Sequence, residues 1–186
     1  QEEIDTILEQ TEKLDFLIQS LVKLSRMESG IIAVHSEDTT IKQMLESIQQ
    51  QFNVKVREKN ITLSLCDTDL HVRCDSKWTV EALGNIVDNA IKYTACGGNV
   101  QIKVEQYSFF VKIDIIDDGI GIEKEEIPKI FGRFYRSLSV ADQPGVGIGL
   151  FLAREIIQAQ KGYIKVTSKR GKGSTFSVFL PIAKKE

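Results

Sequence analysis

The stretch NIVDNAIKYT, residues 85 to 94, places two asparagines four residues apart inside an otherwise apolar run. Asparagine is a poor helix former, because its side chain competes for backbone hydrogen bonds. The surrounding apolar residues nevertheless predict a helix over residues 76–93 with one face on a sheet: Leu83, Ile86, Val87, Ala90 and Ile91 follow the i, i+3, i+4 spacing. Glu81, Asn85 and Asn89 step by four along a different face of this helix.

Two interpretations of that polar face are open. The carboxamides and Lys92 are a plausible lining for a metal triphosphate, since an amide oxygen is a neutral, hard ligand that suits Mg²⁺ where phosphates already supply negative charge. Alternatively the face is solvated, and Asp88 and Lys92 form an ion pair one turn apart.

The segment IDIIDDGIGI, residues 113 to 122, leads an apolar strand into Asp117 and Asp118 and then into Gly119 and Gly121. This arrangement places a carboxylate at a strand end beside backbone that can adopt positive φ. A carboxylate there can accept a hydrogen bond from an exocyclic amine such as that of adenine. An ordinary Asp-Gly turn is the alternative.

The segment PGVGIGLFLAREII, residues 144 to 157, places Gly145, Gly147 and Gly149 at the start of a predicted helix over 148–160. The unpaired N–H groups and the dipole of a helix start favour an anion, so a phosphate could bind there. The segment is not a P-loop, because no Lys-Ser/Thr pair follows the glycines.

Between these segments lies IFGRFYRS, residues 130 to 137. Phe131 and Phe134 suggest a mobile lid fixed by aromatic side chains, with Arg133 and Arg136 directed toward whatever it covers. Simple loop anchoring with surface arginines is equally open.

Residues 1–29 contain neither Pro nor Gly, and their apolar residues repeat at alternating spacings of three and four. This pattern predicts a long amphipathic helix that ends at Ser29 and Gly30. Its stripe consists of Ile4, Ile7, Leu14, Ile18 and Leu21, widened by Leu8, Leu17 and Leu24. We expect a partner helix to cover this stripe; packing on the chain's own domain is the alternative.

The rest of the chain alternates between short strands and helices. Strands are predicted at 31–35, 61–66, 70–74, 100–107, 109–117, 163–168 and 174–180, and a further helix at 40–58, capped by Asp38 or Thr39. Tight turns between strand pairs predict antiparallel pairing. The expected fold is therefore α+β: a two-layer sandwich of a mixed, largely antiparallel sheet with helices on one face, preceded by the long helix.

Composition excludes several classes of protein. The 186 residues carry a formal charge of −2, which gives no electrostatic footprint for nucleic acid. Cys66, Cys74 and Cys96 show no metal or redox spacing and predict free thiols in a reducing compartment. No apolar run has the length of a membrane span, so a soluble piece is expected.

In their order and intervals, the four segments together resemble the ATP-binding domain of the sensor histidine kinases of two-component systems. That domain has the GHKL or Bergerat-type ATPase fold, shared with gyrase, the MutL repair proteins and a heat-shock chaperone. NIVDNAIKYT is similar to the N box, DDGIGI and GVGIGL to the two glycine boxes, FGRFYR to the F box, and GKGSTFSVFLP to the closing hairpin. LVKLSRMESG, residues 21 to 30, resembles the end of the second helix of the dimerisation and phosphotransfer hairpin. Residues 1–30 would then belong to the hairpin and 31–186 to the catalytic domain.

The resemblance implies Mg-ATP as ligand, with Mg²⁺ coordinated by Asn89, and with Asn85 and Lys92 beside the phosphates. Tyr93 would lie near the adenine, and Asp117 would bind its amine. The implied nucleotide-binding set also includes Gly119, Gly121, Ile122, Phe131, Gly145, Gly147, Gly149, Leu150 and Thr175, while the implied catalytic set is Asn85, Lys92, Arg133 and Arg136.

Asn85 separates two reaction types. Hydrolysing relatives of this fold carry a glutamate base at that position, whereas an amide has no basic lone pair at neutral pH. The resemblance therefore implies transfer of the γ-phosphoryl group to a histidine. The alternatives are a nucleotide-binding module without catalysis, a serine kinase of the same fold and, least favoured, a hydrolase.

The acceptor histidine of the family has no counterpart here. His35 and His71 match no acceptor motif, and we expect both to be ordinary structural or surface residues. Either the chain is trimmed after the acceptor helix or it is a degenerate kinase. The implied partners are an acceptor helix of the same or a partner subunit, a response regulator and a second copy of the chain. The implied location is the cytoplasm, with any membrane attachment through upstream sequence.

Overall fold

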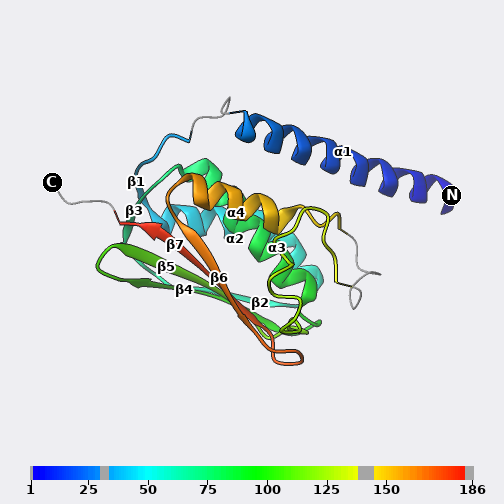
Figure 1. The fold of residues 1–186 in the computed structure, drawn as a ribbon. Helices are drawn as coiled ribbons and strands as arrows, with labels where there is room; N and C mark the ends of the chain where they lie inside the picture. The colour runs from blue at the N-terminus through cyan, green and yellow to red at the C-terminus, as the bar shows by residue number, and fades with distance from the viewer. Residues whose placement is uncertain (1, 30–33, 138–144, 183–186) are drawn as a thin grey trace.

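The computed structural model describes residues 2–29, 34–137 and 145–182, which form four helices and seven strands (Figure 1). In chain order these are α1 (Glu2–Glu28), β1 (Glu37–Thr40), α2 (Ile41–Glu58), β2 (Thr62–Leu65), β3 (His71–Cys74), α3 (Ser76–Tyr93), β4 (Asn99–Gln106), β5 (Phe110–Asp117), α4 (Gly149–Ala159), β6 (Tyr163–Ser168) and β7 (Ser174–Pro181).

Five strands form one mixed sheet in the order β2-β4-β5-β7-β6. The β2–β4 pair is parallel, and the other three pairs are antiparallel. A separate two-stranded sheet pairs β1 with β3. The predicted mixed, largely antiparallel α+β fold is confirmed.

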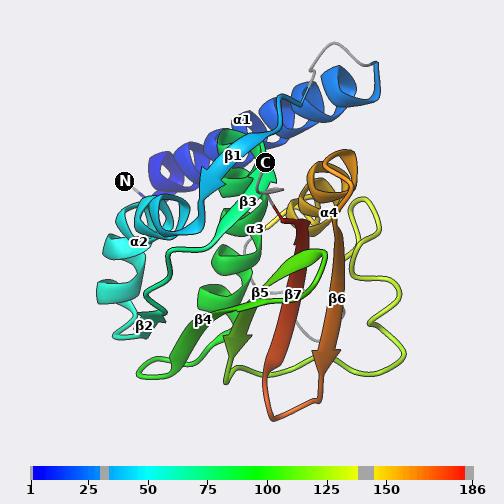
Figure 2. The same cartoon turned by 90° about the vertical axis from the view of Figure 1, so that its left-hand side faces the viewer.

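The helices α2, α3 and α4 cover one face of the five-stranded sheet and leave the other face open (Figures 1 and 2). On β5, alternate side chains point into this layer, and Val111, Ile113 and Ile115 are fully buried. They meet the apolar stripe of α3, including Leu83 and Ile86, which the spacing in the sequence predicted.

The start of α3 explains why a helix forms there. Asp75 is extended at the N-cap, and its side chain accepts a hydrogen bond from the Trp78 N–H at 3.2 Å. This bond satisfies one of the N–H groups that a helix start leaves unpaired. The bounds predicted for α3 are confirmed.

The region before α2 differs from the prediction. The strand expected at 31–35 is wrong where the structure describes it: residues 34 and 35 lie outside any strand, and 31–33 fall outside the described residues. The strand runs instead from Glu37 to Thr40, because these residues pair with β3. The cap of α2 is therefore Thr40, without a side-chain bond, and the predicted caps Asp38 and Thr39 are wrong.

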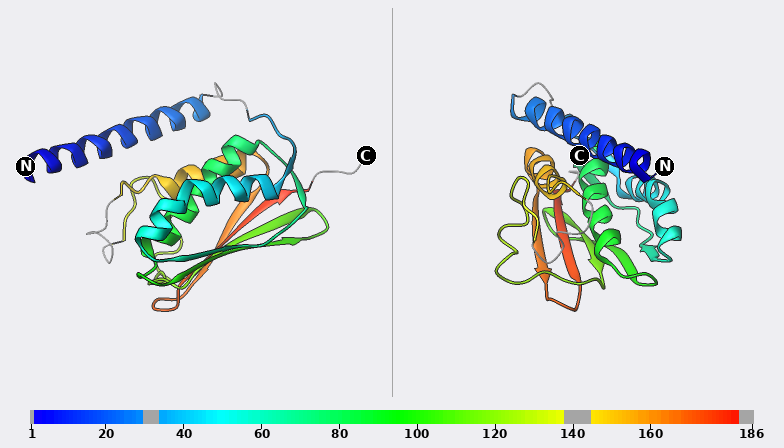
Figure 3. Two further views of the ribbon diagram at one scale, coloured as in Figure 1. Left: turned by 180° about the vertical axis from the view of Figure 1, so that it is seen from behind. Right: turned by 90° about the vertical axis from the view of Figure 1, so that its right-hand side faces the viewer.

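The helix α1 lies above the helical layer of the domain (Figures 1 and 3). One side contacts the domain: Leu17 packs against the core, Ser20 is 5% exposed and Lys23 pairs with Glu81 at 2.7 Å. The predicted stripe remains largely exposed, including Ile4, Ile7, Leu14 and Ile18. None of the described helices is both long and apolar enough to cross a bilayer.

Candidate functional site

A cavity opens between α3, the loop that follows β5, the start of α4 and the ends of β5 and β7. It gathers most of the residues that the sequence singled out: Asn85, Asn89, Lys92, Tyr93, Asp117, Gly121, Ile122, Arg136, Gly145, Gly147, Gly149 and Leu150 line it. These residues come from four segments up to 65 positions apart in the chain, and the sheet register and helix packing bring them together.

The helix α3 supplies the polar wall of the cavity. Asn85, Asn89, Lys92 and Tyr93 all line it, as spacings of three and four on a helix require. The expected alternative, a pair between Asp88 and Lys92, is wrong: Asp88 instead bonds the Lys55 ammonium of α2 at 2.6 Å. The ammonium of Lys92 is therefore not paired with Asp88.

Asn85 meets the start of α4. Its Nδ2 group is buried and has no hydrogen-bond partner among the described residues. An ideal Cβ on Gly149 would lie 3.4 Å from its Oδ1, so this amide packs directly on the first residue of the helix. The N-cap residue Ile148 provides no side-chain acceptor for the helix N–H groups. An unpaired amide and an uncapped helix start therefore converge on one end of the cavity, which favours an anion.

Two cations, Lys92 and Arg136, also line the cavity. Burial lowers the pKa of Lys92, and the nearby charge of Arg136 lowers it further. The Lys92 ammonium also lies 4.9 Å from the centre of the Tyr93 ring. A Cβ on Gly145 would lie 2.6 Å from Lys92 Nζ, so the backbone of the second glycine segment passes close to the ammonium. An anion between the two cations would relieve their repulsion.

Asp117, the last residue of β5, supplies a carboxyl group to the same cavity. It is 7% exposed, and its Oδ1 accepts a hydrogen bond from the Gly119 N–H at 2.9 Å. Burial raises the pKa of this carboxyl group, while hydrogen bonds from the backbone of Gly119 and Ser174 oppose the increase. A ligand amine that donates to this carboxylate would replace part of the lost solvation.

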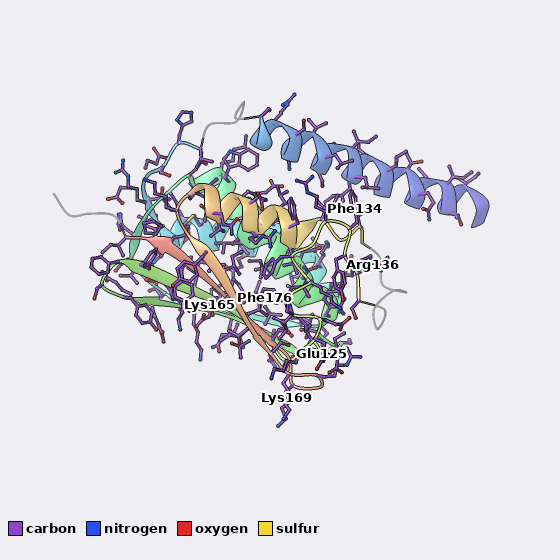
Figure 4. All side chains as sticks on the ribbon, viewed as in Figure 1. Glu125, Phe134, Arg136, Lys165, Lys169 and Phe176 are labelled. Carbon is purple, nitrogen blue, oxygen red and sulfur yellow. The ribbon has the colours of Figure 1, made fainter. Side chains whose placement is uncertain are left out.

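Glycines let the backbone close around this part of the cavity. A Cβ on Gly119 would lie 2.5 Å from the Tyr93 carbonyl oxygen and 2.8 Å from Asp117 Oδ1. Gly121 has φ +66° and packs on the carbonyl oxygen of Lys169 in the β6–β7 turn. Apolar side chains, among them Ile122 and Phe176, also line the cavity. Phe176 is labelled in Figure 4.

The segment 130–137 is tied to α4 and to the second glycine segment. Arg133 lies over the Phe151 ring at 4.6 Å, and Arg154 lies over Phe131 at 5.6 Å. Arg133 and Phe131 are outside the cavity lining, whereas Arg136 is part of it. Arg133 and Phe131 thus fix the segment to the domain, which both interpretations of this loop include.

The turn in this segment is strained. Phe134 has φ +60° and its side chain is 54% exposed, near the end where α4 begins (Figure 4). Gly147 has φ +78°, and a Cβ there would lie 2.6 Å from the Tyr135 carbonyl oxygen. Non-glycine residues rarely adopt positive φ, and such strain persists only where the surroundings enforce it.

Two further expected site residues lie away from the cavity lining. Gly119 contributes only its backbone, which passes close to Tyr93 O and Asp117 Oδ1. Thr175 points to the open face of the sheet, because side chains alternate along β7 and its neighbours Ser174 and Phe176 line the cavity.

Sequence reasoning missed several lining residues, among them Glu126, Tyr135, Ser174, Phe176 and Phe16 of α1. The Tyr135 hydroxyl donates to Glu126 at 3.1 Å. Ser174 pairs with Asp117 in the β5–β7 register. Because side chains alternate along a strand, the pattern of β7 could have indicated that Ser174 and Phe176 share one face. Phe16 offered no signal, since only the packing of α1 brings it there.

The histidines and cysteines take ordinary places. His71 Nδ1 lies 2.5 Å from Asp38 Oδ1 on the small sheet, and the exposed His35 bonds Asp75 through its backbone N–H. The three cysteines are free. Among the described residues no cluster of three His, Cys, Asp or Glu could hold a metal ion. A metal at this site would therefore need oxygen ligands of another kind, such as the side-chain amide of Asn89 in the cavity lining or the oxygens of a triphosphate.

The class of protein follows from this fold and cavity and from a sequence match. Residues 74–184 match the family of histidine kinase-, DNA gyrase B- and HSP90-like ATPases, and the chain belongs to this family.

Within the family, the chain is similar to sensor histidine kinases. It is 34% identical to the sensor histidine kinase WalK of Bacillus subtilis (strain 168) over 92% of its own length and 29% of WalK. Full-length ShkA in complex with AMPPNP is 21% identical and has a TM-score of 0.84 over all of this chain and 39% of ShkA. The histidine kinase ThkA in complex with the response regulator protein TrrA is 22% identical, with a TM-score of 0.80 over 98% of this chain and 51% of ThkA.

These two structures share the fold of the chain. Among the curated relatives, the chain spans 29% of WalK, 36% of PmrB from Pseudomonas aeruginosa and 20% of KdpD from Clostridium acetobutylicum. It therefore corresponds to a part of these proteins.

Proposed function

We propose that the chain is the ATP-binding catalytic domain of a sensor histidine kinase and transfers the γ-phosphoryl group of Mg-ATP to a histidine on a separate helix. One observation carries the proposal. The buried Nδ2 group of Asn85, which has no partner among the described residues, meets the uncapped start of α4 at a cavity that the buried carboxylate of Asp117 also lines. An anion site and an amine acceptor in one cavity suit a nucleotide with its phosphates and its base.

The residues divide by the part of the ligand they would bind. Asp117 would accept the adenine amine, with Tyr93 and the Gly119–Gly121 backbone around the base. Lys92, Arg136 and the first N–H groups of α4 would bind the phosphates. Asn89 would offer its amide oxygen to Mg²⁺, which would neutralise charge on the phosphates, and Asn85 would lie beside them.

Asn85 supports phosphoryl transfer over hydrolysis. It faces the anion end of the cavity, and an amide cannot take a proton from water at neutral pH. Catalysis would then rest on positioning the phosphates in line with an incoming imidazole nitrogen and on neutralising their charge. A nucleotide-binding module without transfer and a serine kinase of this fold remain the competing functions.

The wider organisation is part of the same proposal. Residues 1–30 would form the second helix of a dimerisation hairpin, and 31–186 the catalytic domain. The exposed apolar stripe of α1 supports a second copy of the chain as partner. The ThkA complex supports a response regulator as the next recipient of the phosphoryl group. A cytoplasmic site of action, with any attachment to a membrane through other parts of the protein, belongs to the same proposal.

A transfer assay tests the proposal. The purified chain is incubated with Mg-ATP labelled in the γ-phosphoryl group and a separately supplied hairpin that carries an acceptor histidine. We expect acid-labile label on the hairpin and little free phosphate. Binding without transfer would favour the nucleotide-binding module, and steady phosphate release would favour a hydrolase. The absence of binding that depends on Asn89 and Asp117 would refute the proposal.

A further inference from the structure

The C-terminal end of α3 carries two residues of the proposed nucleotide site, Lys92 and Tyr93. A helix leaves its last four carbonyl groups without partners in the helix itself. In α3 these belong to Ala90, Ile91, Lys92 and Tyr93, and each is accounted for. Thr94 N–H donates to Ala90 O at 3.1 Å, and Ile120 N–H donates to Tyr93 O at 3.2 Å.

A side chain from another helix satisfies the remaining two. The ammonium of Lys59, the C-cap residue of α2, donates to Ile91 O at 2.8 Å and to Lys92 O at 2.6 Å. Lys59 is half-buried, and α2 lies beside α3 in the helical layer (Figure 3). A cation at the carbonyl end of a helix also complements the helix dipole.

This cap is linked to Lys92 and to the first glycine loop of the proposed nucleotide site. Lys92 directs its own ammonium into the cavity while its carbonyl group is bound by Lys59. The next carbonyl, that of Tyr93, holds the first glycine loop through Ile120 and lies where a Cβ on Gly119 would clash at 2.5 Å. A loose end of α3 would thus displace the phosphate-binding lysine, the tyrosine and the loop that follows Asp117.

The main chain of Lys59 is held independently of its side chain. Gly97 N–H donates to Lys59 O at 3.3 Å, and Thr62 N–H donates to Gly98 O at 2.9 Å. The turn between α2 and β2 therefore keeps its place when the ammonium is removed, and a substitution tests the side chain alone.

We infer that Lys59 is a positioning residue of the nucleotide site: its ammonium caps α3 and fixes Lys92, Tyr93 and the Gly119–Ile120 backbone for binding. Lys59 lines no part of the cavity and acts through these groups. The inference rests on the proposed nucleotide site for its functional consequence.

The test compares Lys59→Met, Lys59→Arg and Lys42→Met in the whole chain. Lys42 pairs with Asp67 at 2.9 Å on the surface and is the matched control for loss of one cation. Mg-ATP affinity is measured by calorimetry well below the unfolding temperature of every variant. We expect Lys59→Met to bind about tenfold more weakly, as for other supporting partners of binding residues, and Lys59→Arg to restore most of the affinity. Lys42→Met should bind as the wild type does.

Amide hydrogen exchange gives a second measurement, independent of the ligand. In Lys59→Met, the amides of Thr94 and Ile120 should exchange faster than in the wild type, while β5 amides keep their protection. Wild-type affinity in Lys59→Met, or an equal loss in Lys42→Met, would overturn the inference. If the wild type bound no nucleotide, the proposed function would fail, and unchanged exchange at Ile120 would separately exclude the capping role.

Discussion

Replacing Gly147 by alanine tests whether the contact between the second glycine segment and the turn at Phe134–Tyr135 maintains the site. The added Cβ would lie 2.6 Å from Tyr135 O and 2.8 Å from the Phe134 carbonyl carbon, and both are backbone atoms. The residue would also keep φ +78°. Gly97 is the matched control, because it has φ +82° and nothing within 4 Å of its Cβ position.

The difference between the two variants isolates the clash. Each alanine pays about 1 kcal/mol for the left-handed backbone, which corresponds to a fall of about 2–4 °C in the unfolding temperature. At Gly147 the overlap adds about 1–3 kcal/mol unless the backbone moves. Moving the turn relieves the overlap but displaces Arg136, which lines the cavity.

We therefore expect the penalty to appear in ligand affinity. If ligand binding requires the turn at Phe134–Tyr135 to return to its wild-type position, binding must restore the overlap. The overlap of about 1–3 kcal/mol then lowers the affinity by about 5- to 150-fold. Calorimetric titration with Mg-ATP should show this loss for Gly147→Ala and no more than a twofold change for Gly97→Ala. Equal affinities in the two variants would show that the contact does not maintain the site.

Four further outcomes follow from the contacts. Lys92→Ala should weaken Mg-ATP by about tenfold or more through loss of a charge-assisted bond, yet leave adenosine unchanged in the same titration, since adenosine has no phosphate. Burial raises the pKa of Asp117 above 3.8, so adenosine affinity should fall as the pH drops through that raised pKa and the carboxylate is protonated; a decline that persisted in Asp117→Asn would exclude this residue as the cause. Asn85→Glu should increase steady phosphate release, because it adds a general base, and an unchanged rate would contradict the role assigned to the amide. Gln160 is 3% exposed and accepts from Asp75 N–H at 2.6 Å and Thr79 Oγ1 at 3.2 Å, so Gln160→Leu should cost about 2–4 kcal/mol in urea unfolding.

Local patterns in the sequence were sufficient for most elements and for the residue types of the site. The bounds of α3 and its buried stripe follow from helical spacing alone, and the two carboxamides follow from the same spacing on another face. Such predictions succeed because neighbours on a helix or strand are set by short-range geometry. The predicted strand at 31–35 and the predicted caps of α2 were wrong, because the extended backbone around Asp38 depends on pairing with the distant strand β3.

Only tertiary structure decided which candidates share the cavity. Spacing could not tell that Arg136 reaches it while Arg133 stacks on Phe151, because that depends on how the loop crosses α4. Nor could it show that Asp88 pairs with Lys55, or that Lys59 caps a helix 32 residues further on. The sequence by itself determined the helices and strands and the positions of the amide and glycine residues of the site, because these depend on patterns a few residues long. Packing determined which carbonyls, cations and carboxylates meet, because those distances join segments that only the folded core brings together.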